Sequence, residues 1–279
     1  MIGICTDSGS QLPASLAQRY GIEVVPVTVT VDGIDYLEGV DLEADEFYER
    51  YAGHRRPVVT TSQPSPGQFA VAYDELVARG CTQILSVHVS AATSGTINAA
   101  RLAAHSLELP VRLVDSGTTS FGVSCCAWAA AAAIAEGACL DEAARIAEQL
   151  APNIGNVFVV GAYDHLHDVG CGAGLSGLNG LSGCGLPLLT LKGGNVEVVE
   201  RMNSALDAVN AMATYAIGWG DRLRVAVGHS DPSTEAWADA LEAAVGEAAS
   251  VVDVVRYRVG PSTGAYTGPG TAGCFMFPA

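Results

Sequence analysis

Two segments in the first half of the chain place hydroxyl side chains directly before predicted helices, namely residues 60–66 and 90–96. A helix N-terminus exposes free N–H groups and carries about half a positive charge, so it suits an anion. Hydroxyls from Thr61 and Ser94 would add donors for a carboxylate or a phosphate. The same residue types also serve as ordinary helix caps, and spacing alone leaves that second interpretation open.

A third segment, residues 260–271, is rich in Gly, Pro, Ser and Thr and lies between a predicted strand and the C-terminal apolar run. Such a loop can form a nest of backbone N–H groups that binds an anion. It can also be a plain tight turn, and its composition favours the turn.

The elements that position these segments alternate between short β-branched runs and capped helices. This alternation predicts a mostly parallel sheet covered by helices on both faces. Ser65-Pro66 suits the start of a helix, Gly21 and Gly80 suit helix ends, and Asp32-Gly33 suits a turn. Strands are expected at 3–6, 24–31, 83–89 and 111–114, and helices at 13–20, 42–51, 66–79, 95–106, 121–135 and 141–150.

The pattern changes after Ala151-Pro152-Asn153, which is typical of a boundary. We therefore expect two α/β domains, at 1–152 and 153–279, the second with a mixed sheet and helices. A glycine-rich stretch occupies residues 170–185. Strands are expected at 157–160, 224–227 and 251–259, a hairpin at 186–191 and 196–200, and helices at 204–217 and 233–244.

Charge and composition exclude several function classes. The 279 residues carry a net charge of −16, which disfavours nucleic acid and anionic headgroups as partners. The most apolar uncharged stretch, 121–135, is shorter than the ~20 residues of a membrane helix, so we expect a buried helix and no stable membrane insertion. The N-terminus lacks a basic region, and the eight cysteines are expected to be reduced thiols, which indicates a cytoplasmic protein.

The chain resembles the bacterial DegV family through five motifs that occur in order along nearly its whole length. The family's T-D-S-x-x-x-L-P matches residues 6–13, T-S-Q-P-S-P matches 61–66, S-S-x-L-S-G-T is matched by Ser90 and 94–96, D-S-x-x-x-S-x-G resembles 115–122, and H-T-G-P-G resembles 266–270. Each motif alone is weakly specific, but the ordered set is highly specific.

This resemblance implies a two-domain α/β protein that holds a long-chain fatty acid, such as palmitate, in a tunnel between the domains. It also implies that Thr61 and Ser94 hold the carboxylate. The other binding residues it implies are Ser62, Gly95, Thr96, Tyr266 and Thr267. No catalytic residue, cofactor or metal is implied. Some members hand the acid to a separate fatty acid kinase subunit, and this chain has no G-x-x-x-x-G-K-[ST] motif for ATP.

Two positions depart from the family pattern and bear on the kinase role. Tyr266 replaces the usual histidine, and Gly174 replaces the usual arginine. A tyrosine offers a neutral O–H, whereas histidine can change its charge near neutral pH. Arginine binds a carboxylate or phosphate with two parallel hydrogen bonds, which glycine cannot do.

An enzyme, such as a small-molecule hydrolase, is the first alternative, because Asp7 and Asp115 end predicted strands where catalytic acids of α/β proteins often lie. Such residues also cap the following helix. His229-Ser230-Asp231 has the residue types of a catalytic triad, but three consecutive residues cannot align as a relay, and the chain has no G-x-S-x-G motif.

A metal site is the second alternative, built from Asp164, His165, His167, Cys171 and Cys184. Its residue types suit Zn²⁺, but on a strand these side chains would not all point to one side. Dinucleotide binding through G-x-G-x-x-G at 172–177 is rejected, because that match neither clearly follows a strand nor opens a helix.

Overall fold

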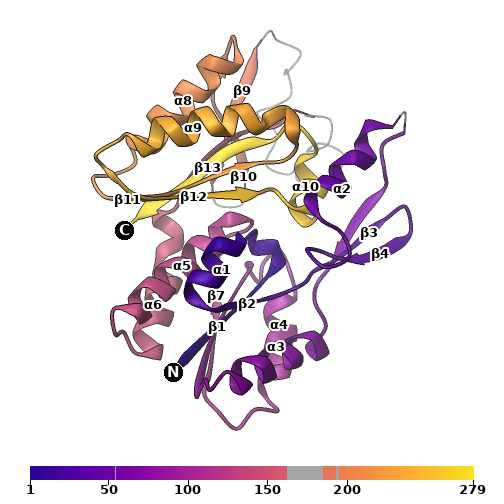
Figure 1. Ribbon diagram of the computed structural model, residues 1–279, viewed down its shortest axis with the longest axis vertical. Helices are drawn as coiled ribbons and strands as arrows, with labels where there is room; N and C mark the ends of the chain where they lie inside the picture. Colours follow the sequence, from indigo (N-terminus) through magenta and orange to yellow (C-terminus); the bar gives the residue numbers. More distant parts are fainter. Residues whose placement is uncertain (54, 162–184, 193–194) are drawn as a thin grey trace. The chain divides into compact units, whose positions relative to one another are not determined.

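The computed structural model describes residues 1–53, 55–161, 185–192 and 195–279 (Figure 1). The chain forms two compact units, of which unit 1 comprises Met1–Leu42 and Val58–Asn153, and unit 2 comprises Glu43–Pro57 and Ile154–Ala279. The sequence-based boundary at 152/153 lies one residue before the boundary of this division, which also places residues 43–57 in unit 2. Residues 43–57 join unit 2 because their helix packs within that unit. No local sequence pattern predicts such a long-range contact.

The main sheet of unit 1 is fully parallel, with the strand order β2-β1-β6-β7. Its strands are β1 (Ile2–Asp7), β2 (Ile22–Val25), β6 (Gln83–His88) and β7 (Val111–Asp115). Its helices are α1 (Ala14–Tyr20), α3 (Pro66–Ala78), α4 (Thr96–Ala104), α5 (Phe121–Ala135) and α6 (Leu140–Leu150). The predicted parallel sheet flanked by helices is confirmed.

Helices cover both faces of this sheet because successive strand residues point to opposite sides. Cys5 packs with residues of α3 and α4, whereas its neighbour Ile4 packs with Ala131 of α5. Figure 1 shows α3 and α4 on one side of this sheet and α5 and α6 on the other. Twelve residues of α5 are buried, which its run of small alanines allows.

A second, antiparallel sheet in unit 1 has the order β4-β3-β5. It contains β3 (Thr28–Val31), β4 (Ile34–Leu37) and β5 (Val59–Ser62). The single strand expected at 24–31 is wrong, because β2 stops before Pro26, which cannot donate a backbone hydrogen bond, and β3 starts in the other sheet. The turn at Asp32-Gly33 is present, with φ values of 49° and 85°.

Unit 2 contains a mixed six-stranded sheet in the order β10-β9-β8-β13-β11-β12. The predicted hairpin is confirmed as the antiparallel pair of β9 and β10, and β11 and β12 are parallel. The strands are β8 (Gly155–Val159), β9 (Leu186–Lys192), β10 (Asn195–Met202), β11 (Leu223–His229), β12 (Val251–Arg258) and β13 (Ala272–Pro278). The C-terminal apolar run thus becomes an inner strand, β13, which pairs with both β8 and β11.

Helices α8 (Ala205–Ile217) and α9 (Glu235–Gly246) supply apolar residues to the core of this unit, including Met212 and Leu241. Two shorter helices, α2 (Ala44–Glu49) and α10 (Pro261–Thr267), and the 3-10 turns η2 (Arg50–Ala52) and η5 (Pro232–Thr234) belong to the same unit. Among the residues that the structure describes, no helix has the length and apolar character needed to cross a bilayer.

Candidate functional site

The two hydroxyl-bearing segments of unit 1 lie directly against each other. Gln63 follows β5, and Gly95 is the N-cap residue of α4. A β-carbon placed on Gly95 would lie 2.2 Å from Oε1 and 3.0 Å from Cδ of Gln63. The Gln63 side chain therefore lies across Gly95, and it can do so because glycine has no side chain. The structure thus brings Gln63, which follows the first segment, into contact with Gly95 of the second.

Ser94 and Thr96 form a hydroxyl pair at the start of α4. Their oxygens are 2.8 Å apart, and the backbone N–H of Thr96 donates to the Ser94 oxygen at 3.3 Å. Thr96 is buried, whereas Ser94 is half-buried. Because one hydroxyl hydrogen is used between the two oxygens, the second O–H of the pair remains available for another acceptor.

Thr61 and Ser62 occupy the last two positions of β5. In the antiparallel register Thr61 faces Val29, and Ser62 faces Thr28. Consecutive residues of a strand point to opposite sides of the sheet, so the two side chains diverge. Thr61 shares its side with the fully buried Val29 and is itself half-buried, whereas Ser62 is exposed. A ligand on one side of this sheet can therefore contact the hydroxyl of Thr61 or that of Ser62, but not both.

Asp115 anchors the loop that leads to Ser94. Its two carboxylate oxygens accept the backbone N–H of Ala91 at 3.2 Å each, and one of them accepts the N–H of Gly117 at 3.0 Å. The sequence identifies Asp115 as a candidate catalytic acid, but these contacts describe a carboxylate occupied by backbone donors. The sequence singles out Asp115 and includes Gln63 in a family motif, but it does not reveal these contacts, because both residues act on segments brought near by the fold.

The predicted ligand residues Tyr266 and Thr267 belong to unit 2. They end α10, a seven-residue helix, so residues 260–271 form neither a pure turn nor the expected loop. Pro261 sits in the first turn, where a missing N–H is harmless, and Gly268 stops the helix with a φ of 70°. Tyr266 is 39% exposed, and the Thr267 hydroxyl donates to the Thr263 carbonyl at 3.4 Å.

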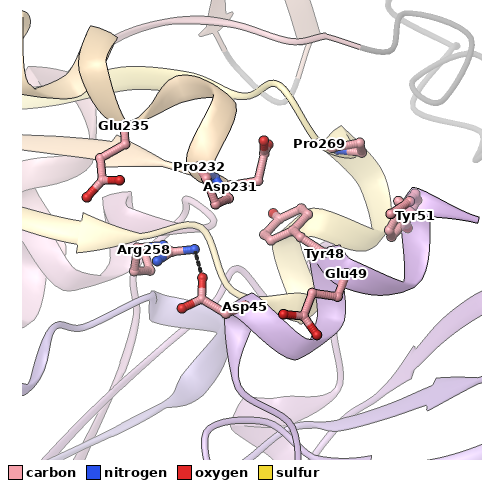
Figure 2. Close-up of a pocket in the computed structure, with 10 residues that line it drawn as sticks. Asp45, Tyr48, Glu49, Tyr51, Asp231, Pro232, Glu235, Arg258 and Pro269 are labelled. Carbon is pink, nitrogen blue, oxygen red and sulfur yellow. Dashed lines mark hydrogen bonds and ion pairs between the residues drawn. The ribbon is translucent and has the colours of Figure 1, made fainter.

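Figure 2 shows a pocket of about 630 Å³ within unit 2. A guanidinium N–H of Arg258 donates to Asp45 at 2.6 Å and to the Ser230 carbonyl at 2.8 Å. The lining is Asp45, Tyr48, Glu49, Tyr51, Ala52, Asp231, Pro232, Glu235, Arg258 and Pro269. Four carboxylates and one guanidinium therefore line this pocket, which disfavours a carboxylate ligand, and neither Tyr266 nor Thr267 is among the lining residues.

The consecutive His229, Ser230 and Asp231 do not form a relay. Ser230 donates its hydroxyl to Asp231 at 2.6 Å, and Asp231 also accepts the N–H groups of Ser233 and Gly270. His229 instead accepts a hydrogen bond from Arg256 at 3.2 Å through Nδ1. Burial, with Arg258 and Arg256 nearby, lowers the pKa of His229 to about 4. The triad-like sequence is thus a strand end followed by a capped turn.

The two alternatives from the glycine-rich region fall on residues whose structure is not described. Asp164, His165, His167, Cys171 and Cys184 lie there, as do Gly174 and the match at 172–177. Within the described ranges, no group of His, Cys, Asp and Glu side chains is arranged to hold a metal ion.

Comparison with known proteins gives one family along the entire chain. A family model described as "Uncharacterised protein, DegV family" matches residues 1–279. A DegV domain-containing protein of Streptomyces coelicolor is 34% identical over 276 residues, which is 98% of this chain and 96% of that protein.

Solved structures agree with this match. A structure described as "Fatty Acid Binding of a DegV family Protein from Thermus thermophilus" has a TM-score of 0.85 and 30% identity, covering 100% of this chain and 99% of that one. A DegV lipid binding protein from Thermotoga maritima has a TM-score of 0.82 and 25% identity, covering 99% and 98%. Both units of the chain are included in these similarities, and the chain belongs to the DegV family.

Proposed function

We propose that this protein binds a long-chain fatty acid and holds its carboxylate between Thr61 and Ser94. The contact between residues 61–63 and 94–96, made through Gln63 and Gly95, carries this proposal. The similar Thermus thermophilus protein is described as fatty acid binding, which supports the ligand class.

The chemistry of the α4 N-terminus suits a carboxylate. The helix has nine residues, and its first turn contains no acidic side chain. The hydroxyl pair of Ser94 and Thr96 supplies a neutral donor beside the positive end of the helix dipole. A carboxylate placed there keeps hydrogen bonds in place of its lost hydration, which it needs in order to be removed from water.

The acyl chain supplies most of the binding free energy. Burying ~16 carbons at ~0.8 kcal/mol per methylene gives roughly 12 kcal/mol before association costs are subtracted. The head group then needs only a few donors to fix its position. On this basis the proposed ligand can bind without an arginine or lysine at the carboxylate.

The proposal extends to presentation of the bound acid to a separate fatty acid kinase subunit, as the family resemblance implies. The binding protein would contribute position and the partner would contribute ATP. Tyr266 can donate a neutral hydrogen bond where the family has histidine, so any transfer should lack the pH dependence of a titrating imidazole near neutrality. An acyl-phosphate assay with a kinase subunit from the same organism tests this extension.

The binding proposal is tested with the double variant Thr61→Val/Ser94→Ala. Removing both hydroxyls should weaken palmitate binding by about tenfold to a hundredfold, as expected for the loss of two hydrogen bonds to a charged group. The matched control is Thr60→Val/Thr93→Ala, which removes exposed hydroxyls one residue away from each site. Equal affinity of the two double variants in titration calorimetry would reject the proposed carboxylate position.

A further inference from the structure

Four buried polar side chains form a continuous hydrogen-bonded chain in unit 1. Asp7 Oδ2 lies 2.8 Å from His88 Nδ1, His88 Nε2 lies 2.6 Å from Ser86 Oγ, and Ser86 Oγ lies 2.9 Å from Tyr73 Oη. Asp7 is 1% exposed, and the other three are fully buried. Burying a carboxylate is unfavourable unless it is paired, so the fold retains this chain despite a cost.

These four hydrogen-bonded side chains connect the elements next to the two segments of the proposed carboxylate site. Ser86 and His88 belong to β6, and the loop containing Ser94 begins two residues after His88. Tyr73 belongs to α3, which is preceded by residues 61–65. The edge of the Phe69 ring, also in α3, packs on the His88 imidazole at 5.0 Å between centroids. His88 lies in β6, which leads into the loop that contains Ser94. It contacts α3, which follows residues 61–65, directly at Phe69 and through Ser86 at Tyr73.

The loop itself is tied to the same point of the sheet. His88 pairs with Asp115 in the register of β6 and β7, and its carbonyl accepts the N–H of Ser116 at 3.0 Å. Asp115 in turn holds the N–H of Ala91. A shift of His88 would thus be transmitted to the loop through the backbone of two neighbouring strands.

One arrangement of hydrogens uses every donor of these four side chains. In it, Asp7 accepts from Nδ1–H of His88, Nε2 of His88 accepts from Ser86, and Ser86 accepts from Tyr73. Burial raises the pKa of Tyr73, which keeps this hydroxyl protonated as the terminal donor. Every donor along the chain is used in this arrangement, so all four side chains are orientationally fixed.

The order Asp–His–Ser is that of a hydrolytic relay, but this geometry does not support hydrolysis. The Ser86 oxygen is fully buried and bonded on both sides, so no substrate carbonyl can approach it. Asp7, considered above as a catalytic acid, is equally inaccessible. A role in holding structure is the one that the contacts allow.

We propose that His88, oriented by Asp7 and Ser86, is a positioning residue for the carboxylate site. It keeps β6 and α3 in one arrangement and thereby holds residues 94–96 against residues 61–63. This inference rests on the proposed function, because the site that it positions is the one proposed for the fatty acid carboxylate.

The test uses Tyr73→Phe and Ser86→Ala, each of which removes one hydroxyl without adding atoms. Hydrogen exchange of the unliganded protein should rise by about fivefold to tenfold at the amides of residues 90–99, as expected for one lost hydrogen bond. The dissociation constant for palmitate should rise by a similar factor. His88→Phe, which keeps an aromatic ring beside Phe69 but removes both hydrogen bonds, should produce a larger change.

Ser124→Ala is the matched control. Ser124 is a fully buried serine of α5 in the same unit, and its hydroxyl makes one hydrogen bond of 2.7 Å, to the Ser10 carbonyl. This variant should lower the melting temperature about as much as Ser86→Ala while leaving exchange at residues 90–99 and palmitate affinity unchanged.

Two results are separable. If Tyr73→Phe and Ser86→Ala lower stability but leave exchange at residues 90–99 at the level of Ser124→Ala, the positioning role is overturned, whether or not His88→Phe folds. If the wild-type protein binds no fatty acid, the proposed function fails, and the exchange measurement still decides whether the chain positions the loop.

Discussion

Both units end a strand of a parallel pair with a histidine, but the two histidines have partners of opposite charge. His88 ends β6 and contacts the Asp7 carboxylate, whereas His229 ends β11 and contacts the Arg256 guanidinium. Their register partners differ in the same sense, with Asp115 beside His88 and Arg258 beside His229. Equivalent positions in two α/β units have therefore acquired different electrostatic surroundings.

This difference indicates where each unit can accept an anion. In unit 1 the carboxylates of Asp7 and Asp115 are occupied by an imidazole and by backbone N–H groups, which leaves neutral hydroxyls at the start of α4. In unit 2 Arg258 is held by Asp45 within a pocket that has three further carboxylates. Under the proposed function, the anion site therefore lies in the unit with fewer basic side chains at its strand ends.

The largest expected effect comes from removing the partner of His88. Asp7→Ala should reduce the free energy of unfolding by about 2–3 kcal/mol, because it leaves the buried Nδ1–H of His88 without its hydrogen-bond acceptor. Arg256→Met removes the partner of His229 together with its ion pairs to Asp239 and Glu242, but the side chain is only partly buried, and about 1 kcal/mol is expected. Urea denaturation measures both, and equal losses would remove the distinction between the two histidines.

The second effect is the pH dependence contributed by His229. Its pKa is lowered from 6.5 to about 4 in the folded protein, so the unfolded state binds a proton more readily. This contribution to stability is complete above pH ~6.5 and is lost as the pH falls toward ~4. Allowing for solvent screening, we expect about 1–2 kcal/mol of this loss to disappear in His229→Gln. Parallel stability curves for the wild type and the variant would contradict the assignment.

The smallest expected effect concerns the contact between the two hydroxyl segments. Gly95→Ala places a methyl group against Gln63, a flexible side chain that can move away, so the loss of stability should stay within about 1 kcal/mol. Palmitate affinity should fall severalfold, since the segments separate. Gln63→Ala in the same chain should restore it, and failure of this rescue in calorimetry would argue that Gly95 acts in another way.

The regular elements follow closely from the sequence, whereas the contacts between distant residues do not. Ser65-Pro66 and Gly80 delimit α3 as expected, because caps act on their own helix. Pro26 divides the strand expected at 24–31, and β5 is only four residues long, too short to show a clear alternation. The short helix α10 is not predicted from the sequence, because its Gly, Ser and Thr residues are typical of a turn.

The candidate site could be predicted in part. Thr61 and Ser94 are visible as hydroxyls before helices, and the ordered family motifs favour them over ordinary caps. Gln63 over Gly95 and the pairing of Asp7 with His88 depend on parallel strands that bring together residues 81 positions apart. No periodicity in the sequence predicts such a contact, so only the structure identifies these supporting residues.

The most direct test of fatty acid binding is lipid extraction of the purified protein, followed by mass spectrometry, with Thr61→Val/Ser94→Ala and Thr60→Val/Thr93→Ala prepared in parallel. The account predicts about one fatty acid per chain in the wild type and the control, and a strong depletion in Thr61→Val/Ser94→Ala. Equal occupancy in all three proteins would contradict the carboxylate position, and an empty wild-type protein that also fails to bind added palmitate would contradict fatty acid binding itself.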